Sequence, residues 1–127
     1  LVHDNADVRR WFADVVVVER ELWVAEDIEA GVIGVLVLNG DWVDQLYVEP
    51  GLTGKGIGST LLDVAKRERP RGLQLWTFQS NAGAQGFYRR HGFAEAERTD
   101  GAGNEEGAAD VRYEWRPAPV STPSRPV

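Results

Sequence analysis

The chain has 127 residues, 43% of them hydrophobic and 27% charged, which is the balance of one small globular domain with its own core. It contains no cysteine, so disulfides, a thiolate nucleophile and cysteine metal ligands are excluded, and its net charge of −6 argues against a nucleic-acid partner. No apolar run approaches the ~18 residues that span a membrane and no secretory signal is visible, so we expect a cytoplasmic protein.

The first third of the chain predicts a short helix and then three strands. Apolar side chains recur at helical spacing within residues 4–13, which predicts a short amphipathic helix. The pair Asn39-Gly40 is typical of a tight hairpin turn. The three strands are expected at residues 22–25, 31–38 and 42–48.

The remainder of the chain alternates helices and strands. Pro70 ends one predicted helix, and Gly92 is placed to end another in a left-handed conformation. We therefore predict an α/β (α+β) domain over residues 1–116, with a mixed, mostly antiparallel sheet flanked by helices, and a flexible proline-rich tail at 117–127. The elements expected here are a helix at 57–69, a strand at 73–78, a helix at 81–91, and strands at 93–99 and 111–115.

A glycine-spaced turn separates the strand that ends at Val48 from the helix that begins at Ile57. Gly54, Gly56 and Gly58 follow one another at two-residue intervals, which matches neither the Walker A phosphate loop nor the Gly-x-Gly-x-x-Gly dinucleotide motif. Such a turn leaves main-chain N–H groups uncovered at the start of a helix, where phosphate binds. By itself the turn allows two interpretations, a phosphate site or a glycine-rich turn without a ligand.

A second segment, residues 73–93, places polar groups on one helix face. Asn81, Gln85 and Tyr88 occur at i, i+4 and i+7, and Asn81 can also cap the helix. Together the two segments resemble the cofactor-binding motifs of the GNAT superfamily of N-acetyltransferases. The matching residues are Val48-Glu49-Pro50 and Thr53-Gly54-Lys55-Gly56-Ile57-Gly58 in the first motif, and Asn81, Phe87-Tyr88 and Gly92-Phe93 in the second.

The resemblance covers residues 21–116 and has one departure, since Thr53 stands where the family usually has Gln or Arg. It implies the family's fold, in which one more strand and one more helix usually come first. That strand and helix have no counterpart among the predicted elements, although in the family they wall one side of the acceptor site. A homodimer could complete that wall.

The resemblance implies that acetyl-CoA is the cosubstrate and that its acetyl group passes to a primary amine of a small molecule or a protein by direct attack. The diphosphate would lie on the N–H groups from Gly54 to Ser59, and the pantetheine arm would pair with the strand edge at Leu46 and Val48. The N–H of Val48 would stabilise the oxyanion, and Asn81 would bind the pantetheine arm. The cofactor-binding residues are therefore expected to be Leu46, Tyr47, Val48, Thr53, Gly54, Lys55, Gly56, Ile57, Gly58, Ser59, Asn81 and Tyr88.

Tyr88 and Asp44 are the expected catalytic residues. Tyr88 would protonate the leaving thiolate, because a phenol is about as weak an acid as a thiol; its other interpretation is a buried aromatic residue. Asp44, or a water chain, would take the proton from the incoming ammonium, while Glu49 is expected on the opposite face of the strand. His91 is interpreted as structural, because the last turn of a helix favours an imidazolium. No metal site is expected, because the two histidines lack matched carboxylate spacing.

Two alternatives to the enzyme remain open at the level of the sequence. The chain could be a CoA-binding module that no longer catalyses transfer, or an interaction module on the same scaffold. Residues 104–106 and Asp110 could contact a cationic acceptor or form a solvated loop. Tryptophans such as Trp76 and Trp115 are expected in the core.

Overall fold

The computed structural model describes residues 14–19, 21–103 and 106–118 of the chain. The helix predicted at residues 4–13 and the tail beyond Ala118 lie outside the described residues. The elements are β1 (Asp14–Glu19), β2 (Leu22–Asp27), β3 (Gly31–Asn39), β4 (Trp42–Val48), α1 (Ile57–Glu68), β5 (Leu73–Phe78), α2 (Ala82–Arg90), β6 (Ala94–Thr99) and β7 (Asp110–Trp115).

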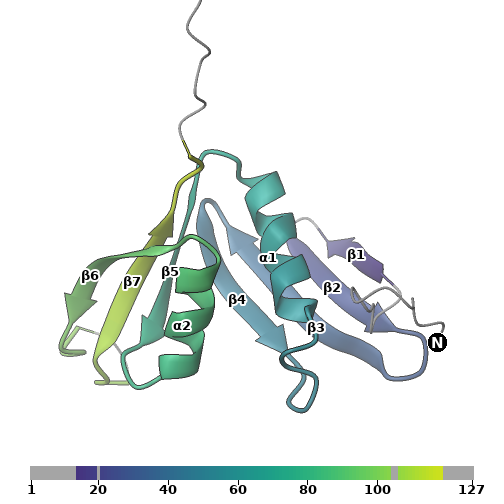
Figure 1. Ribbon diagram of the computed structural model, residues 1–127, viewed down its shortest axis with the longest axis horizontal. Coiled ribbons are helices and arrows are strands. Elements are labelled where there is room, and N and C mark those ends of the chain that lie inside the picture. The colour runs from purple at the N-terminus through teal and green to yellow at the C-terminus, as the bar shows by residue number, and fades with distance from the viewer. Residues whose placement is uncertain (1–13, 20, 104–105, 119–127) are drawn as a thin grey trace, which may run out of the picture.

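The strands form one seven-stranded sheet in the order β1-β2-β3-β4-β5-β7-β6. The β4–β5 pair is parallel and the other pairs are antiparallel, which confirms the predicted mixed, mostly antiparallel sheet. In Figure 1 both helices lie on the same face of the sheet, α1 over β3 and β4 and α2 beside β5. Within the described residues, no helix is long and apolar enough to cross a membrane.

The strands and helices predicted between residues 22 and 115 are all present, with ends that shift by at most two residues. The structure adds β1, which the sequence analysis did not assign. This strand pairs antiparallel with β2, with Val16 opposite Val24, and only two residues separate the two strands. No helix therefore lies between β1 and β2. The valine run in β1 is short enough to be a strand, and its β-branched side chains favour one.

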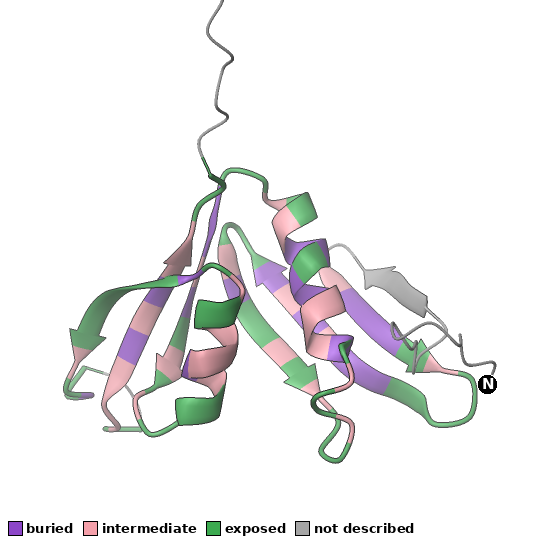
Figure 2. Cartoon of the chain, viewed as in Figure 1, coloured by how far each residue is buried: buried purple, intermediate pink, exposed green. Residues whose placement is uncertain are grey.

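The core lies between α1 and the strands beneath it and continues into β5 and β7 (Figure 2). Leu61 and Ala65 of α1 are fully buried, and so is Leu36 of β3. A side chain at Gly34 would meet atoms of Ile57 and Leu61 at 3.0 Å, so the glycine allows α1 to lie close to β3. This close packing fixes where α1 begins relative to the end of β4.

Arg69 ties the other end of α1 to the sheet. Its main-chain N–H donates to Ala65 O at 2.9 Å, which closes the helix. Its guanidinium donates to Gly40 O at 2.6 Å and to a carboxylate oxygen of Glu21 at 2.5 Å. The helix is thus held at both ends, by packing at its start and by Arg69 at its finish.

The parallel pair of strands is short. β4 and β5 share a single register position, Trp42 opposite Gln74, and the N–H of Gln74 donates to Asp41 O at 2.9 Å. Beyond this point the two strands diverge in Figure 1. The later part of β4, which includes Leu46 and Val48, therefore has no strand partner on its β5 side within the described residues.

Candidate functional site

A cavity of about 700 Å³ lies where β4, the glycine turn, the start of α1 and α2 meet. It brings together two segments that are far apart in sequence, as the resemblance predicted. It also includes Gly83, Ala84, Phe87, Arg90 and His91, which were not predicted as binding residues. The residues that line it are Leu46, Val48, Thr53, Gly54, Gly56, Gly58, Ser59, Gly83, Ala84, Phe87, Tyr88, Arg90 and His91.

The glycine turn presents bare backbone to this cavity. Gly54 and Gly56 have φ angles of 82° and 86°, in the left-handed region that favours glycine. A side chain placed at either position would meet nothing within 4 Å, so the space beside the backbone is open. Alternating left-handed glycines in a turn of this kind form a concave anion site.

The start of α1 has no side-chain cap among the described residues. Gly56 is the N-cap residue and makes no side-chain cap hydrogen bond, and the first turn holds no acidic side chain. The first helical hydrogen bond runs from the N–H of Thr60 to Gly56 O at 3.0 Å, so the N–H groups of residues 57–59 lack helical acceptors. Uncapped donors at the positive end of a helix, facing open space, are suited to bind an anion.

Gly58 has a different role from the other two glycines. A side chain at this position would lie 3.3 Å from the ring of Phe87 and 3.5 Å from the side chain of Val48. The missing side chain therefore allows the first turn of α1 to approach both α2 and β4 closely. Gly54 and Gly56 thus shape the turn, while Gly58 allows the close packing at the wall of the cavity.

Main-chain N–H groups of β4 point alternately toward β3 and toward the gap between β4 and β5. The N–H of Glu49 donates to Ile33 O at 2.8 Å, so residue 49 faces β3. Because direction alternates along an antiparallel pair, the N–H of Val48 faces away from β3, toward the gap between β4 and β5. Tyr47 faces β3 with its backbone, and its exposed hydroxyl donates to Glu49 at 3.3 Å.

Asn81 serves as the N-cap of α2. Its side-chain oxygen accepts a hydrogen bond from the N–H of Ala84 at 3.0 Å, which confirms the capping role. Gln85, on the same face, is buried and joins α2 to the end of β5 by donating to Gln79 O at 2.8 Å. Its oxygen accepts from the hydroxyl of Tyr113 at 3.2 Å. Gln85 is therefore a structural residue between α2 and the sheet.

Tyr88 packs among aromatic rings and lines the cavity. Its ring lies edge-on to Phe87 at 5.3 Å and to Phe93 at 5.5 Å between centroids. Burial raises the pKa of its phenol from 10.0 to about 12. This hydroxyl makes no hydrogen bond to another described residue. Tyr88 thus keeps its proton at neutral pH and has its donor available.

His91 lines the cavity and also joins two helices, in keeping with its structural interpretation, but the imidazolium form expected for it is not favoured. Its Nε2 lies 3.0 Å from Ser59 Oγ, which joins the end of α2 to the start of α1. Burial, followed by the charge of Lys66, lowers the pKa of His91, so the neutral ring is favoured instead. The sequence signal was present in the pair Arg90-His91 at the end of the helix, but only the packing of α2 on α1 shows that it faces the cavity.

Several predicted residues do not line the cavity. In the β3–β4 register, Gln45 pairs with Val37 and Val43 pairs with Leu38, so Asp44 is the extra residue of a β-bulge. The bulge interrupts the strict alternation on which the expected opposite faces of Asp44 and Glu49 depend. The predicted residues outside the lining are Asp44, Tyr47, Lys55, Ile57 and Asn81.

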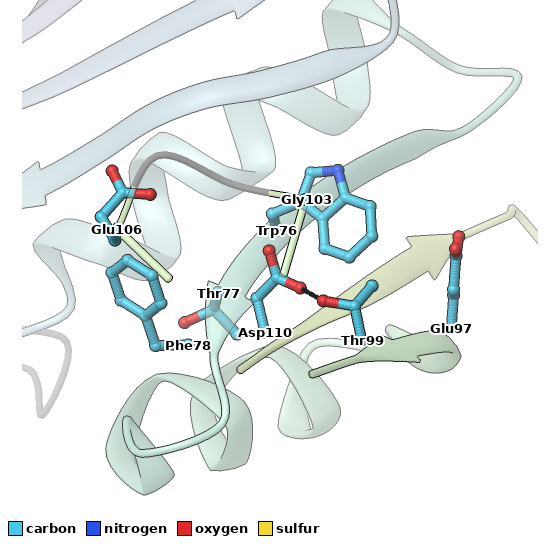
Figure 3. Close-up of a pocket in the computed structure, with 8 residues that line it drawn as sticks. All are labelled: Trp76, Thr77, Phe78, Glu97, Thr99, Gly103, Glu106 and Asp110. Carbon is cyan, nitrogen blue, oxygen red and sulfur yellow. Dashed lines mark hydrogen bonds between the residues drawn. The ribbon is translucent and has the colours of Figure 1, made fainter. Parts of the chain in front are cut away.

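A second cavity, of about 560 Å³, lies against β5, β6 and β7 (Figure 3). It corrects the expectation that Trp76 lies in the core, because this side chain is 42% exposed. The described His, Asp and Glu side chains nowhere gather in threes as a metal site would require. The residues that line this second cavity are Trp76, Thr77, Phe78, Glu97, Thr99, Gly103, Glu106 and Asp110.

Comparison with known protein families gives one family match. The profile of the acetyltransferase (GNAT) domain matches residues 18–95, which contain the glycine turn, α1, and the whole of α2. This range is more than half of the chain and holds both predicted motifs.

Individual relatives agree with the family match. The chain is 34% identical over 82 residues to a peptidyl-lysine N-acetyltransferase, YjaB, of Salmonella typhimurium, covering 65% of this chain and 56% of that protein. The solution structure of apo YjaB from Escherichia coli superimposes with a TM-score of 0.68 at 27% identity, covering 79% of this chain and 67% of the other. The chain spans about half the length of the curated relatives it matches.

A third comparison concerns the fold alone. The crystal structure of a NatC complex, bound to a Gag peptide and CoA, superimposes with a TM-score of 0.67 at 22% identity. It covers 76% of this chain and 71% of that one.

Proposed function

The chain belongs to the GNAT family of acetyltransferases, and from this premise we propose that it transfers the acetyl group of acetyl-CoA to a primary amine. The observation that carries the proposal is the uncapped start of α1, where left-handed Gly54 and Gly56 leave main-chain donors open to a cavity. The same cavity is bounded by the unpaired side of β4 and by Tyr88. Acetyl transfer from acetyl-CoA needs a binding site for the diphosphate, a strand edge for the pantetheine arm and a proton donor for the thiolate.

The cosubstrate would be held by backbone more than by side chains. The diphosphate would accept hydrogen bonds from the N–H groups between Gly54 and Ser59, with the positive end of α1 behind them. Thr53 would donate its backbone N–H to the diphosphate, and the neutral His91 beside Ser59 would donate one ring N–H. The amide groups of the pantetheine arm would pair with Leu46 and Val48, as an added strand does.

The transfer would proceed by direct attack of the amine nitrogen on the thioester carbon. The C–N bond forms, the C–S bond breaks, and the N–H of Val48 would donate to the oxygen that becomes negative on the way. Tyr88 would give its proton to the departing thiolate. The proton lost by the amine would pass to a base, for which we propose Asp44 or a chain of waters that ends in solvent.

The acceptor is proposed to be an amine of a small molecule or of a protein. Because relatives at about a third identity are named for peptidyl-lysine, a lysine side chain is the first acceptor to test. A cytoplasmic location and a homodimer also stay predictions. The competing proposal is a module that binds CoA without catalysis.

Two measurements separate these proposals. Calorimetry with acetyl-CoA should give a dissociation constant of roughly 1 μM to 1 mM. If acetyl-CoA does not bind, only the interaction module remains. Release of the CoA thiol in the presence of a lysine peptide then tests catalysis. The protein has no cysteine, so a thiol reagent reads CoA without a protein background. Binding without amine-dependent release would favour the non-catalytic module.

A further inference from the structure

The second cavity lies on the face of β5 that is turned away from α2. Leu75 of β5 is buried and pairs with Tyr113, which contacts Tyr88 of α2. Trp76 and Phe78 alternate with Leu75 and so project from the other face of the sheet. The second cavity and the cosubstrate site thus lie on opposite faces of the sheet.

Two large aromatic side chains are exposed together in this cavity. Trp76 is 42% exposed and Phe78 is 40% exposed. An exposed aromatic pair that no chain segment among the described residues covers is unusual, because burial of such rings is strongly favourable. Figure 3 shows both rings at the cavity, with carboxylates around them.

The charges around the two rings are mainly negative. Asp110 accepts a hydrogen bond from the hydroxyl of Thr99, and Glu106 is an exposed residue at the loop side of the cavity. Glu97 pairs with Arg112 at 3.1 Å, and this guanidinium also pairs with Glu114 outside the lining. Three carboxylates and one guanidinium leave a net negative field over two aromatic faces. Organic cations are recognised by this combination, through cation–π and charge attraction.

We propose that this cavity binds a cationic group of the amine acceptor, so that the protein prefers acceptors with a second positive charge beside the amine that is acetylated. The inference rests on the proposed function. The acceptor would lie along the face of β5 that is turned away from α2. Its reacting amine would reach the thioester past the unpaired side of β4, where β4 and β5 diverge (Figure 1).

The direct test is binding of three small molecules that share a five-carbon chain with a primary amine at one end and differ at the other end. 1,5-Diaminopentane carries a second positive charge, pentylamine carries none, and 5-aminopentanoate carries a negative one. The indole N–H resonance of Trp76, assigned by its loss in Trp76→Phe, reports binding in the cavity. We expect the diamine to move this resonance and to bind at least about fivefold tighter than the other two amines.

Matched variants separate the ring and charge contributions. Trp76→Leu keeps an apolar side chain but loses the ring, and it should weaken diamine binding about five- to thirtyfold, while Trp76→Phe stays within about threefold. Glu106→Gln should weaken it about two- to fivefold, whereas Glu29→Gln, on the distant β2–β3 turn, changes net charge equally and should have no effect.

The outcomes also separate this inference from the proposed function. A Trp76 resonance that does not move, or equal affinity for the three amines, would overturn the inference even if acetyl transfer occurs. Selective binding of the diamine, lost in Trp76→Leu, would support the cation site even if no thiol is released. When transfer is observed, the diamine should also have the lowest KM of the three.

Discussion

Tyr88 combines a retained proton with a position at the cavity wall. Because its pKa is raised to about 12, the phenol is protonated across the neutral range, as a donor to a thiolate must be. We expect Tyr88→Phe to lower kcat about 10- to 100-fold while the affinity for acetyl-CoA changes less than about threefold, measured by thiol release and calorimetry.

Tyr113→Phe is the matched control for that change. It also removes one phenolic hydroxyl, but this hydroxyl donates to Gln85 at 3.2 Å inside the core. The control should lose about 1 kcal/mol of stability and keep its kcat. Equal turnover of Tyr88→Phe and Tyr113→Phe would remove Tyr88 from the mechanism.

The raised pKa of Tyr88 also predicts how stability depends on pH. In the unfolded chain this phenol ionises near its ordinary pKa of 10.0, but in the folded protein it holds its proton to about 12. The unfolded state therefore binds fewer protons between these pH values, so the free energy of unfolding falls as pH rises from 10 to 12. Urea unfolding at pH 9 and pH 11 should show that the wild type loses about 1.4 kcal/mol more than Tyr88→Phe. An equal loss in both proteins would mean that the phenol is not buried as described.

At the scale of elements, the glycine turn can be separated into its backbone role and its binding role. Gly56 and Gly40 both have positive φ, 86° and 59°, and a side chain at either would meet nothing within 4 Å. We expect Gly56→Ala and Gly40→Ala to lose about 1–2 kcal/mol of stability each, because alanine is strained in this conformation. Only Gly56→Ala should weaken acetyl-CoA binding, by about tenfold or more in calorimetry. Comparable weakening in Gly40→Ala would contradict a binding role for the turn.

Apart from β1, the described elements could be predicted from local sequence. β4 and β5 were predicted with their observed ends, because glycine and proline stand beside apolar runs at both strands. The start of α1 followed from the glycine turn, and the caps of α2 followed from Asn81 and Gly92. Each of these features depends on residues that are near one another in the chain.

Features that depend on distant packing could not be predicted. Leu75 and Trp76 are both apolar, and only the position of α2 decides which of them is buried. The bulge at Asp44 follows from the register with β3 and not from the sequence of β4. The contact of His91 with Ser59 joins residues of two helices, so neither helix alone indicates it.

For the whole molecule, β4 and β5 pair at only one position of the sheet and then diverge, and this predicts a pattern of hydrogen exchange. The N–H groups of Leu46 and Val48 face the gap beside β5, whereas the N–H of Tyr47 faces β3. In the protein alone we expect Leu46 and Val48 to exchange much faster than Tyr47. Saturation with acetyl-CoA should slow the exchange of Leu46 and Val48 toward that of Tyr47, if the pantetheine arm pairs with this edge. Exchange of Leu46 and Val48 that is unaffected by acetyl-CoA would place the pantetheine arm elsewhere.

The proposed acetyl transfer depends above all on whether the backbone of the glycine turn binds the diphosphate of CoA. The most direct measurement is an NMR titration of ¹⁵N-labelled protein with CoA, and with pantetheine, which lacks the diphosphate. The amide resonances of Gly56, Gly58 and Ser59 should move with CoA and stay unchanged with pantetheine. If those three amides keep their positions while CoA saturates the protein, the diphosphate binds elsewhere and the proposed cosubstrate site is wrong.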